Sequence, residues 1–199
     1  MAFAHNDCRP THAMPVNLCL ACGLCCNGVM FHTVRLQPAD SAPALAALGL
    51  RLKRKKGAHY ILQPCPAWRE AQCSIYAARP ERCRVFACRQ LERVAAGETT
   101  EAAALEKIRE VQGRVAQVEA LLARAGRTDA KRPLAKRCEK ILAEPPELSA
   151  NPAALALRGE ITRAMAALNA VLDADFRLTP LAVSEGDAPA LPESFFPAR

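Results

Sequence analysis

Residues 19–26 read Cys-Leu-Ala-Cys-Gly-Leu-Cys-Cys, and this stretch decides how the first half of the chain folds. Two residues separate Cys19 from Cys22 and Cys22 from Cys25, so the backbone can fold as a tight turn and bring the sulfur atoms toward one point. Gly23 follows the second cysteine and suits the positive φ that such a turn often needs. Small proteins hold zinc or an iron–sulfur cluster with sulfur atoms presented in this way.

Eight of the ten cysteines lie within residues 19–88. Eight thiolates would satisfy two four-sulfur zinc sites, or one four-ligand cluster with thiols to spare. Neighbouring side chains usually diverge, so Cys25 and Cys26 are not expected both to bind one mononuclear ion. Either they serve two metal centres, or one of them is a ligand and the other is a buried thiol.

The cellular compartment decides between metal ligands and disulfide bonds. The first residues lack the basic segment and the uninterrupted apolar stretch of a secretory signal. The longest apolar run, residues 42–50, contains a proline and a glycine and is too short to span a bilayer. We therefore expect a soluble, cytoplasmic protein with no membrane contact. In that compartment, clustered cysteines are more often metal ligands or redox groups than disulfides.

The composition indicates a globular chain with a modest core. The 199 residues are 51% hydrophobic and 24% charged, which excludes a wholly disordered or fibrous protein. Alanine supplies much of the apolar count, and aromatic residues make up only 5%. Residues 19–88 contain too few large apolar side chains to order themselves alone. A bound metal would therefore contribute directly to their folding.

The second half of the chain is rich in Ala, Leu, Glu and Arg and has the periodicity of helices. Thr100 can cap a helix over residues 101–125, and Gly126 follows as its stop. Every third or fourth residue of this helix is apolar, namely Ala104, Ile108, Val111, Val115, Val118 and Leu122. Such a narrow stripe suits a partner helix. Packing within the chain is favoured over a contact with another protein, and this helical region is the candidate surface for a protein partner.

A second long helix is expected from Pro152 to about residue 173, because Asn151 can cap it and proline suits the first helical position. Its apolar residues share one face: Leu157, Ile161, Met165, Leu168 and Leu172. A shorter helix over residues 133–142 completes a helical hairpin or small bundle.

The first half is mostly loop, with short strands expected over residues 28–34 and 58–63 and a short helix over residues 38–48. The predicted fold class is therefore α+β. It consists of a small cysteine-rich metal-binding module with short strands, packed against a C-terminal helical hairpin or bundle. The expected boundaries are 1–90 for the module, 91–177 for the helical region and 178–199 for a flexible tail.

A longer pattern resembles a known family. The opening motif is followed by Pro64-Cys65, then Cys73-Ser74-Ile75-Tyr76, then Arg79-Pro80, and then Cys83-Arg84-x-Phe86-x-Cys88. This order resembles the bacterial CxxCxxCC cysteine-cluster family, which includes the YkgJ-type proteins and is described as zinc- or iron-chelating. The resemblance implies that the metal ligands are Cys19, Cys22, Cys25, Cys26, Cys65, Cys73, Cys83 and Cys88. Cys8 and Cys138 lie outside the motif, and Cys138→Ser is expected to change neither metal content nor stability.

The spacing leaves the identity of the metal open. It departs from the ferredoxin run, because the fourth cysteine directly follows the third. A zinc ion held by four sulfurs would be structural, whereas an iron–sulfur cluster could serve electron transfer, sensing or structure. An iron–sulfur cluster is slightly favoured over zinc. Four arginines near the last two cysteines could offset the negative charge of the thiolates: Arg79, Arg82, Arg84 and Arg89.

Metal binding with a redox or accessory role is the function that the sequence favours. The alternative, by resemblance, is a protein-modifying enzyme, because one branch of the family is flagellin lysine N-methylase. Classical enzyme motifs are absent, since the nine glycines never form Gly-x-Gly. A third reading is a nucleic-acid-binding module, given a net charge of +7 and the basic residues 51–56. A solvated turn is favoured there, because no aromatic residues are interleaved.

Overall fold

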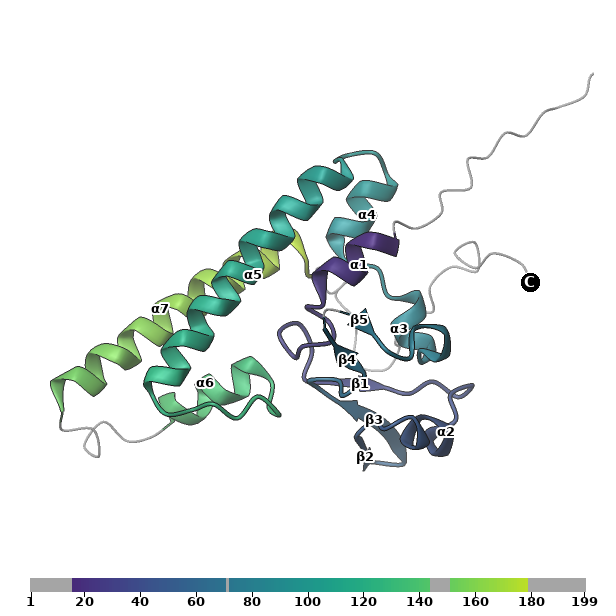
Figure 1. Ribbon diagram of the computed structural model, residues 1–199, viewed down its shortest axis with the longest axis horizontal. Helices are drawn as coiled ribbons and strands as arrows, with labels where there is room; N and C mark the ends of the chain where they lie inside the picture. Colours follow the sequence, from purple (N-terminus) through teal and green to yellow (C-terminus); the bar gives the residue numbers. More distant parts are fainter. Residues whose placement is uncertain (1–15, 71, 144–150, 179–199) are drawn as a thin grey trace, which may run out of the picture.

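The computed structural model describes residues 16–70, 72–143 and 151–178. Within them, seven α-helices combine with small antiparallel sheets, which confirms the α+β fold class (Figure 1). The long helices lie on one side of the molecule and the sheets on the other. Cys8 and residues 179–199 of the expected tail lie outside the described part. No helix in the described ranges is both long and apolar enough to cross a membrane.

The larger sheet is antiparallel, with the strand order β1-β3-β2. Its strands are β1 (Thr33–Arg35), β2 (Leu52–Lys55) and β3 (Ala58–Leu62). Strands β2 and β3 form a hairpin whose turn residues, Lys56 and Gly57, have φ of 48° and 79°. Two positive φ angles match the twist of a tight hairpin. The strand predicted over residues 58–63 is confirmed to within one residue.

The strand predicted over residues 28–34 is wrong for most of its length, because β1 begins later. Gly28 has a φ of 82°, which takes the backbone out of the extended conformation. The Met30 N–H donates to the Leu24 carbonyl at 3.0 Å, so a turn rather than a strand ladder satisfies it. Val29 and Met30 pack against the helices instead. Their apolar side chains are the reason that the pattern looked like a strand.

A second sheet pairs β4 (Trp68–Arg69) with β5 (Gln72–Cys73). Three short helical segments lie near the two sheets, α2 (Ala42–Ala47), η1 (Tyr76–Ala78) and α3 (Glu81–Val85), and α4 (Arg89–Ala95) follows them in the sequence. The Ser41 hydroxyl caps α2, so the helix predicted over residues 38–48 is present but shorter. We call the buried residues of this part the sheet core: Leu36, Leu45, Leu50, Ile61 and Ala67.

The solvated turn favoured for residues 51–56 is wrong for most of its length, because residues 52–55 form β2 at one edge of the larger sheet. Just before this strand, Arg51 donates to the Pro64 carbonyl at 2.7 Å and to the Lys131 carbonyl at 3.3 Å, which ties the sheet to the segment that precedes the helix beginning at Leu134. The next charged side chains, from Lys53 to Lys55, are exposed. Charged residues on an edge strand oppose pairing with another sheet.

Three helices form the C-terminal region: α5 (Glu101–Arg124), α6 (Leu134–Leu142) and α7 (Pro152–Asp175). Both predicted caps are confirmed. The Thr100 hydroxyl oxygen accepts the Ala103 N–H at 3.2 Å, and the Asn151 side-chain oxygen accepts the Ala153 N–H at 2.9 Å. Such caps satisfy N–H groups that have no partner inside the helix.

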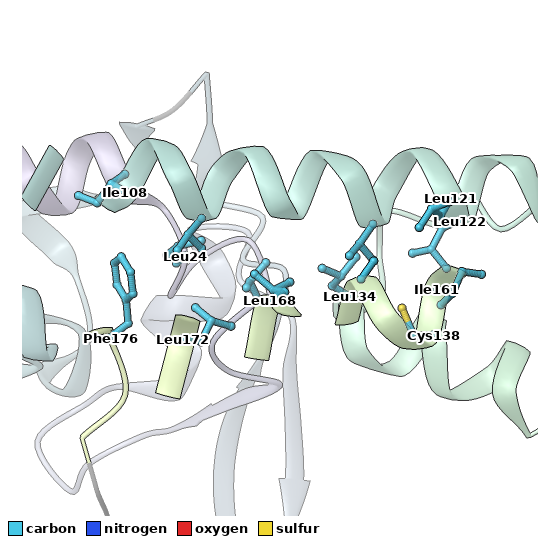
Figure 2. Close-up of a cluster of buried hydrophobic side chains, with 14 of the residues drawn as sticks. Leu24, Ile108, Leu121, Leu122, Leu134, Cys138, Ile161, Leu168, Leu172 and Phe176 are labelled. Atoms are coloured by element: carbon cyan, nitrogen blue, oxygen red, sulfur yellow. The ribbon is translucent and has the colours of Figure 1, made fainter. Parts of the chain in front are cut away.

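Helices α5 and α7 pack along each other, with α6 beside them (Figure 2). The stripe predicted on α5 is buried in this contact, with Val115 only partly so. The stripe therefore packs within the chain. Helix α1 (Val16–Cys22) and the loop after it lie against the first half of α5 and contribute Leu18 and Leu24. We call this assembly the helical core.

Thr100→Ala is expected to lower the free energy of unfolding by about 1 kcal/mol, because it removes the cap of α5. Urea denaturation followed by circular dichroism would measure the change. Thr99→Ala is the matched control, since the neighbouring threonine lies before the cap, and its stability should stay within about 0.5 kcal/mol of the wild type. Equal losses in the two variants would contradict the role of Thr100.

Candidate metal centre

One cavity of about 400 Å³ lies between the helical core and the sheets. All eight cysteines of the predicted ligand set line it. Among the described residues that line it there is no histidine and no carboxylate, and its charged residues are Arg35, Arg79 and Arg82. Cys138 lies elsewhere, 2% exposed within the helical core. The donors around the cavity are therefore almost entirely soft sulfur atoms.

The opening motif folds as a helix end followed by a turn. Helix α1 ends at Cys22, and Gly23 leaves it with a φ of 65°. The Gly23 carbonyl then accepts the Cys26 N–H at 2.8 Å, which closes the turn that carries Cys25 and Cys26. A Cβ atom on Gly23 would lie 2.2 Å from the Trp68 ring. The glycine is therefore required both by the backbone and by the indole that packs on it.

The later cysteines are attached to this turn by backbone contacts. The Cys65 N–H donates to the Cys26 carbonyl at 2.7 Å, and the Trp68 N–H donates to the Cys65 carbonyl at 3.0 Å. The two-stranded sheet places Cys73 opposite Trp68. Cys83 lies on α3, whose first N–H, from Glu81, donates to the Asp40 carboxylate at 2.9 Å. Residues distant in sequence thus meet around the first motif.

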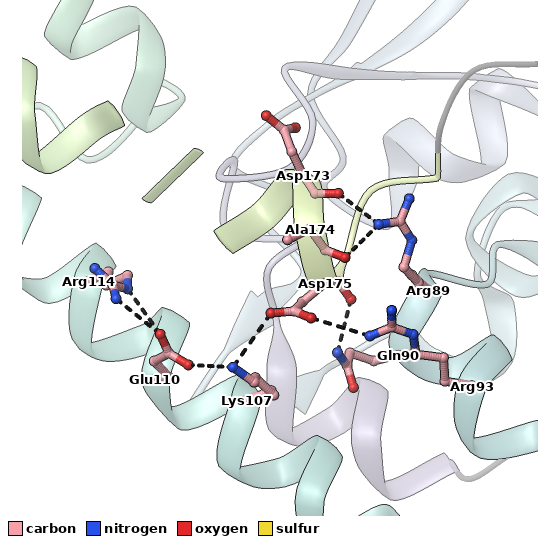
Figure 3. Close-up of polar contacts among 9 residues, drawn as sticks. All are labelled: Arg89, Gln90, Arg93, Lys107, Glu110, Arg114, Asp173, Ala174 and Asp175. Atoms are coloured by element: carbon pink, nitrogen blue, oxygen red, sulfur yellow. Dashed lines mark hydrogen bonds and ion pairs between the residues drawn. The ribbon is translucent and has the colours of Figure 1, made fainter. Parts of the chain in front are cut away.

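Cys88 immediately precedes α4, which is anchored at the end of α7 (Figure 3). Arg89 donates to the carbonyls of Asp173 and Ala174, and Gln90 donates to the carbonyl of Asp175 at 3.0 Å. A cation there also faces the negative end of the helix dipole. Arg89 is one of the four arginines expected to offset the charge of the thiolates. Its guanidinium instead joins the start of α4 to the end of α7. Its contacts fix the position of Cys88 on the cavity.

Burial in this cavity disfavours the charged form of several thiols. It raises the pKa of Cys22 and of Cys26 to about 12, and that of Cys83 to about 11. Neighbouring thiols raise these pKa values further, because nearby negative charges would repel one another. A metal ion that displaces the protons is the natural compensation for so many thiolates in one place.

Against the effect of burial, backbone groups and an arginine lower the pKa of some of these cysteines and so favour the thiolate form. Burial raises the pKa of Cys22, Cys65 and Cys88, and hydrogen bonds to nearby backbone groups partly offset it. The charge of Arg79 likewise lowers the pKa of Cys19 and Cys83 against the effect of burial. Arg79 is held in place, with its guanidinium 3.5 Å from the centre of the Tyr76 ring. These groups would stabilise sulfur ligands once a metal is bound.

The side chains fit a metal that prefers sulfur, but they have to move closer together. In the three described ranges, no three His, Cys, Asp or Glu side chains already form a group that could hold an ion. The nine cysteines described there are all free thiols. Gln63 also lines the cavity, is 4% exposed, and has a side-chain oxygen with no hydrogen-bond partner. An unpaired buried acceptor is costly, and a hydrogen-bond donor that entered the cavity would satisfy it.

Comparison with protein families gives one match. Residues 18–113 match the CxxCxxCC model, described as a "putative zinc- or iron-chelating domain". This stretch, which is just under half of the chain, is similar to that domain. No curated protein and no solved structure matched the chain significantly. The match confirms the resemblance seen in the sequence. The matched stretch spans every cysteine that lines the cavity and excludes Cys138.

Some features of the structure were not predicted from the sequence. Gln63 was not singled out, although a polar residue at the end of an apolar strand and directly before Pro64 was a usable signal. The expectation that Cys138→Ser leaves stability unchanged does not fit its burial, because serine would place a hydroxyl in an apolar core. His32 and His59 are both absent from the lining of the cysteine cavity.

Proposed function

We propose that the protein binds zinc or iron through the eight cysteines of its CxxCxxCC domain, with an iron–sulfur cluster favoured over zinc. One observation carries the proposal. Cysteines as far apart in sequence as residues 19 and 88 line a single cavity, whereas Cys138, the other described cysteine, is packed among helices. Sulfur donors select zinc, copper(I) or iron–sulfur clusters over hard cations such as magnesium and calcium.

The chain itself supplies position, shielding and charge. Trp68 and Tyr76 line the cavity, and Phe31 and Phe86 meet edge to face there with ring centres 5.1 Å apart. These rings exclude water from the sulfur atoms, and the Arg79 guanidinium offsets part of their charge. A bound cluster would supply electron transfer or sensing, and a bound zinc ion would supply a structural cross-link. We therefore propose a redox or accessory role in place of catalysis.

Elemental analysis of protein purified without oxygen tests this function. Iron and acid-labile sulfide, with an absorption band at about 400 nm, are the expected result. A protein that contains zinc and no sulfide would support the proposed metal binding but would contradict the preference for an iron–sulfur cluster. Protein that is folded by circular dichroism but retains neither metal, and takes up neither on reconstitution, would overturn the proposed function.

Metal removal is expected to loosen the sheets far more than the helices. The sheet core consists of only five residues, whereas the helical core joins α5, α6 and α7. Hydrogen exchange should show amides of β3 exchanging about tenfold faster or more after chelation, with those in the centre of α5 little changed. Unchanged protection of β3 would mean that the metal adds nothing to the stability of the sheets.

A further inference from the structure

The cysteine cavity has two different walls. Cys22 and Cys88 pack against the helical core, whereas Cys65 packs against the sheet core. Cys25 and Cys26 come from the turn between these walls, and adjacent side chains on such a turn diverge. The thiols are therefore distributed over two sides of the cavity, and the turn at residues 25 and 26 is the point at which the two sides meet.

Four thiols gather at the helical wall. Cys19 and Cys22 lie one turn apart on α1, and Cys88 is held nearby by the anchoring of α4. Cys25 directly follows Leu24, whose side chain is buried in the helical core. The side chains of Cys22 and Cys88 also pack against that core. These four residues therefore lie on the helical side of the cavity.

Four other thiols gather at the sheet wall. The Cys65 N–H donates to the Cys26 carbonyl at 2.7 Å, and the two-stranded sheet sets Cys73 beside this pair. Cys83 lies on α3, which the hydrogen bond from the Glu81 N–H to the Asp40 carboxylate attaches to the segment just before α2. Helix α2 contributes Leu45 to the sheet core. These four residues therefore lie on the sheet side of the cavity, and the two sides meet at Cys25 and Cys26.

We propose that the eight cysteines form two adjacent four-sulfur metal centres. The helical centre consists of Cys19, Cys22, Cys25 and Cys88, and the sheet centre consists of Cys26, Cys65, Cys73 and Cys83. This division rests on the proposed function. Four sulfurs complete the coordination of one zinc ion or of one iron–sulfur cluster, so each centre is closed by protein ligands alone. It also explains why two cysteines stand side by side: each belongs to a different centre.

Zinc titration of the reduced, metal-free full chain tests the division, with paired serine variants that remove equal numbers of thiols. The wild type should bind two zinc ions. Cys22→Ser with Cys88→Ser removes two ligands of the helical centre and should leave one ion bound. Cys22→Ser with Cys83→Ser removes one ligand from each centre and should leave none bound tightly. Equal zinc content in the two double variants would overturn the division.

A measurement on the wild type covers the case in which a variant does not fold. After half-saturation with zinc, thiols that remain free are alkylated and identified by mass spectrometry. As the zinc concentration rises, the four thiols of one centre should become protected from alkylation together. The four thiols of the other centre should become protected over a different range of zinc concentration. If the chain binds one zinc ion and all eight thiols follow the same protection curve, the division into two centres is wrong. The proposed function would still stand in that case. No bound zinc and no bound iron would overturn both.

Discussion

Gly23→Ala is expected to lower the free energy of unfolding by about 2–5 kcal/mol, because overpacking and left-handed strain add together. The new Cβ atom would lie 2.2 Å from the Trp68 ring, closer than any real contact, and alanine is disfavoured at a φ of 65°. Moving the indole would disturb β4, and moving the turn would displace Cys25 and Cys26. Metal content should therefore fall together with stability, as measured by urea denaturation and elemental analysis.

Gly113→Ala is the matched control for this variant. Gly113 lies within α5, is exposed, and a Cβ atom there would meet nothing within 4 Å. Alanine is the better helix former, so this variant should gain about 0.5–1 kcal/mol and keep its metal. The same glycine-to-alanine substitution is thus expected to lower the free energy of unfolding at Gly23 and to raise it at Gly113. A stable, fully loaded Gly23→Ala protein would show that the contact with Trp68 does not shape the turn.

Leu168→Ala is expected to cost about 2–5 kcal/mol in the free energy of unfolding. Leu168 is 1% exposed on α7 and packs in the helical core, so removing its side chain leaves a cavity between long helices that cannot close fully (Figure 2). Urea denaturation monitored by helix content would measure this loss. Metal content of the variant that remains folded should stay near that of the wild type, because Leu168 is not among the residues that line the cysteine cavity.

Leu155→Ala provides the comparison on the same helix. Leu155 is 46% exposed, so shortening its side chain leaves no buried cavity. The free energy of unfolding should therefore change by less than about 0.5 kcal/mol. The two variants remove the same atoms and differ only in burial. Similar losses for both would show that the contact between α5 and α7 is not the main source of stability in this region.

The helices could be predicted from the sequence because their signals are local. Thr100 and Asn151 each cap a helix through N–H groups two or three residues away. Strand β2 was missed, because residues 51–56 were interpreted as a solvated turn, although the hairpin turn at Lys56 and Gly57 is a local signal. The strand expected over residues 28–34 failed for a different reason. Apolar residues there were interpreted as a strand, but Val29 and Met30 pack against the helical core.

The sequence by itself determined which atoms are available as ligands, where the helices begin, and that Gly23 follows the second cysteine. Only the tertiary structure decided how the thiols are shared between two walls. Spacing controls a turn over a few residues, whereas the place of Cys88 depends on contacts such as the one from Arg89 to Asp173, 84 residues later. Packing between distant segments brings such groups together, and no local pattern encodes the resulting distances.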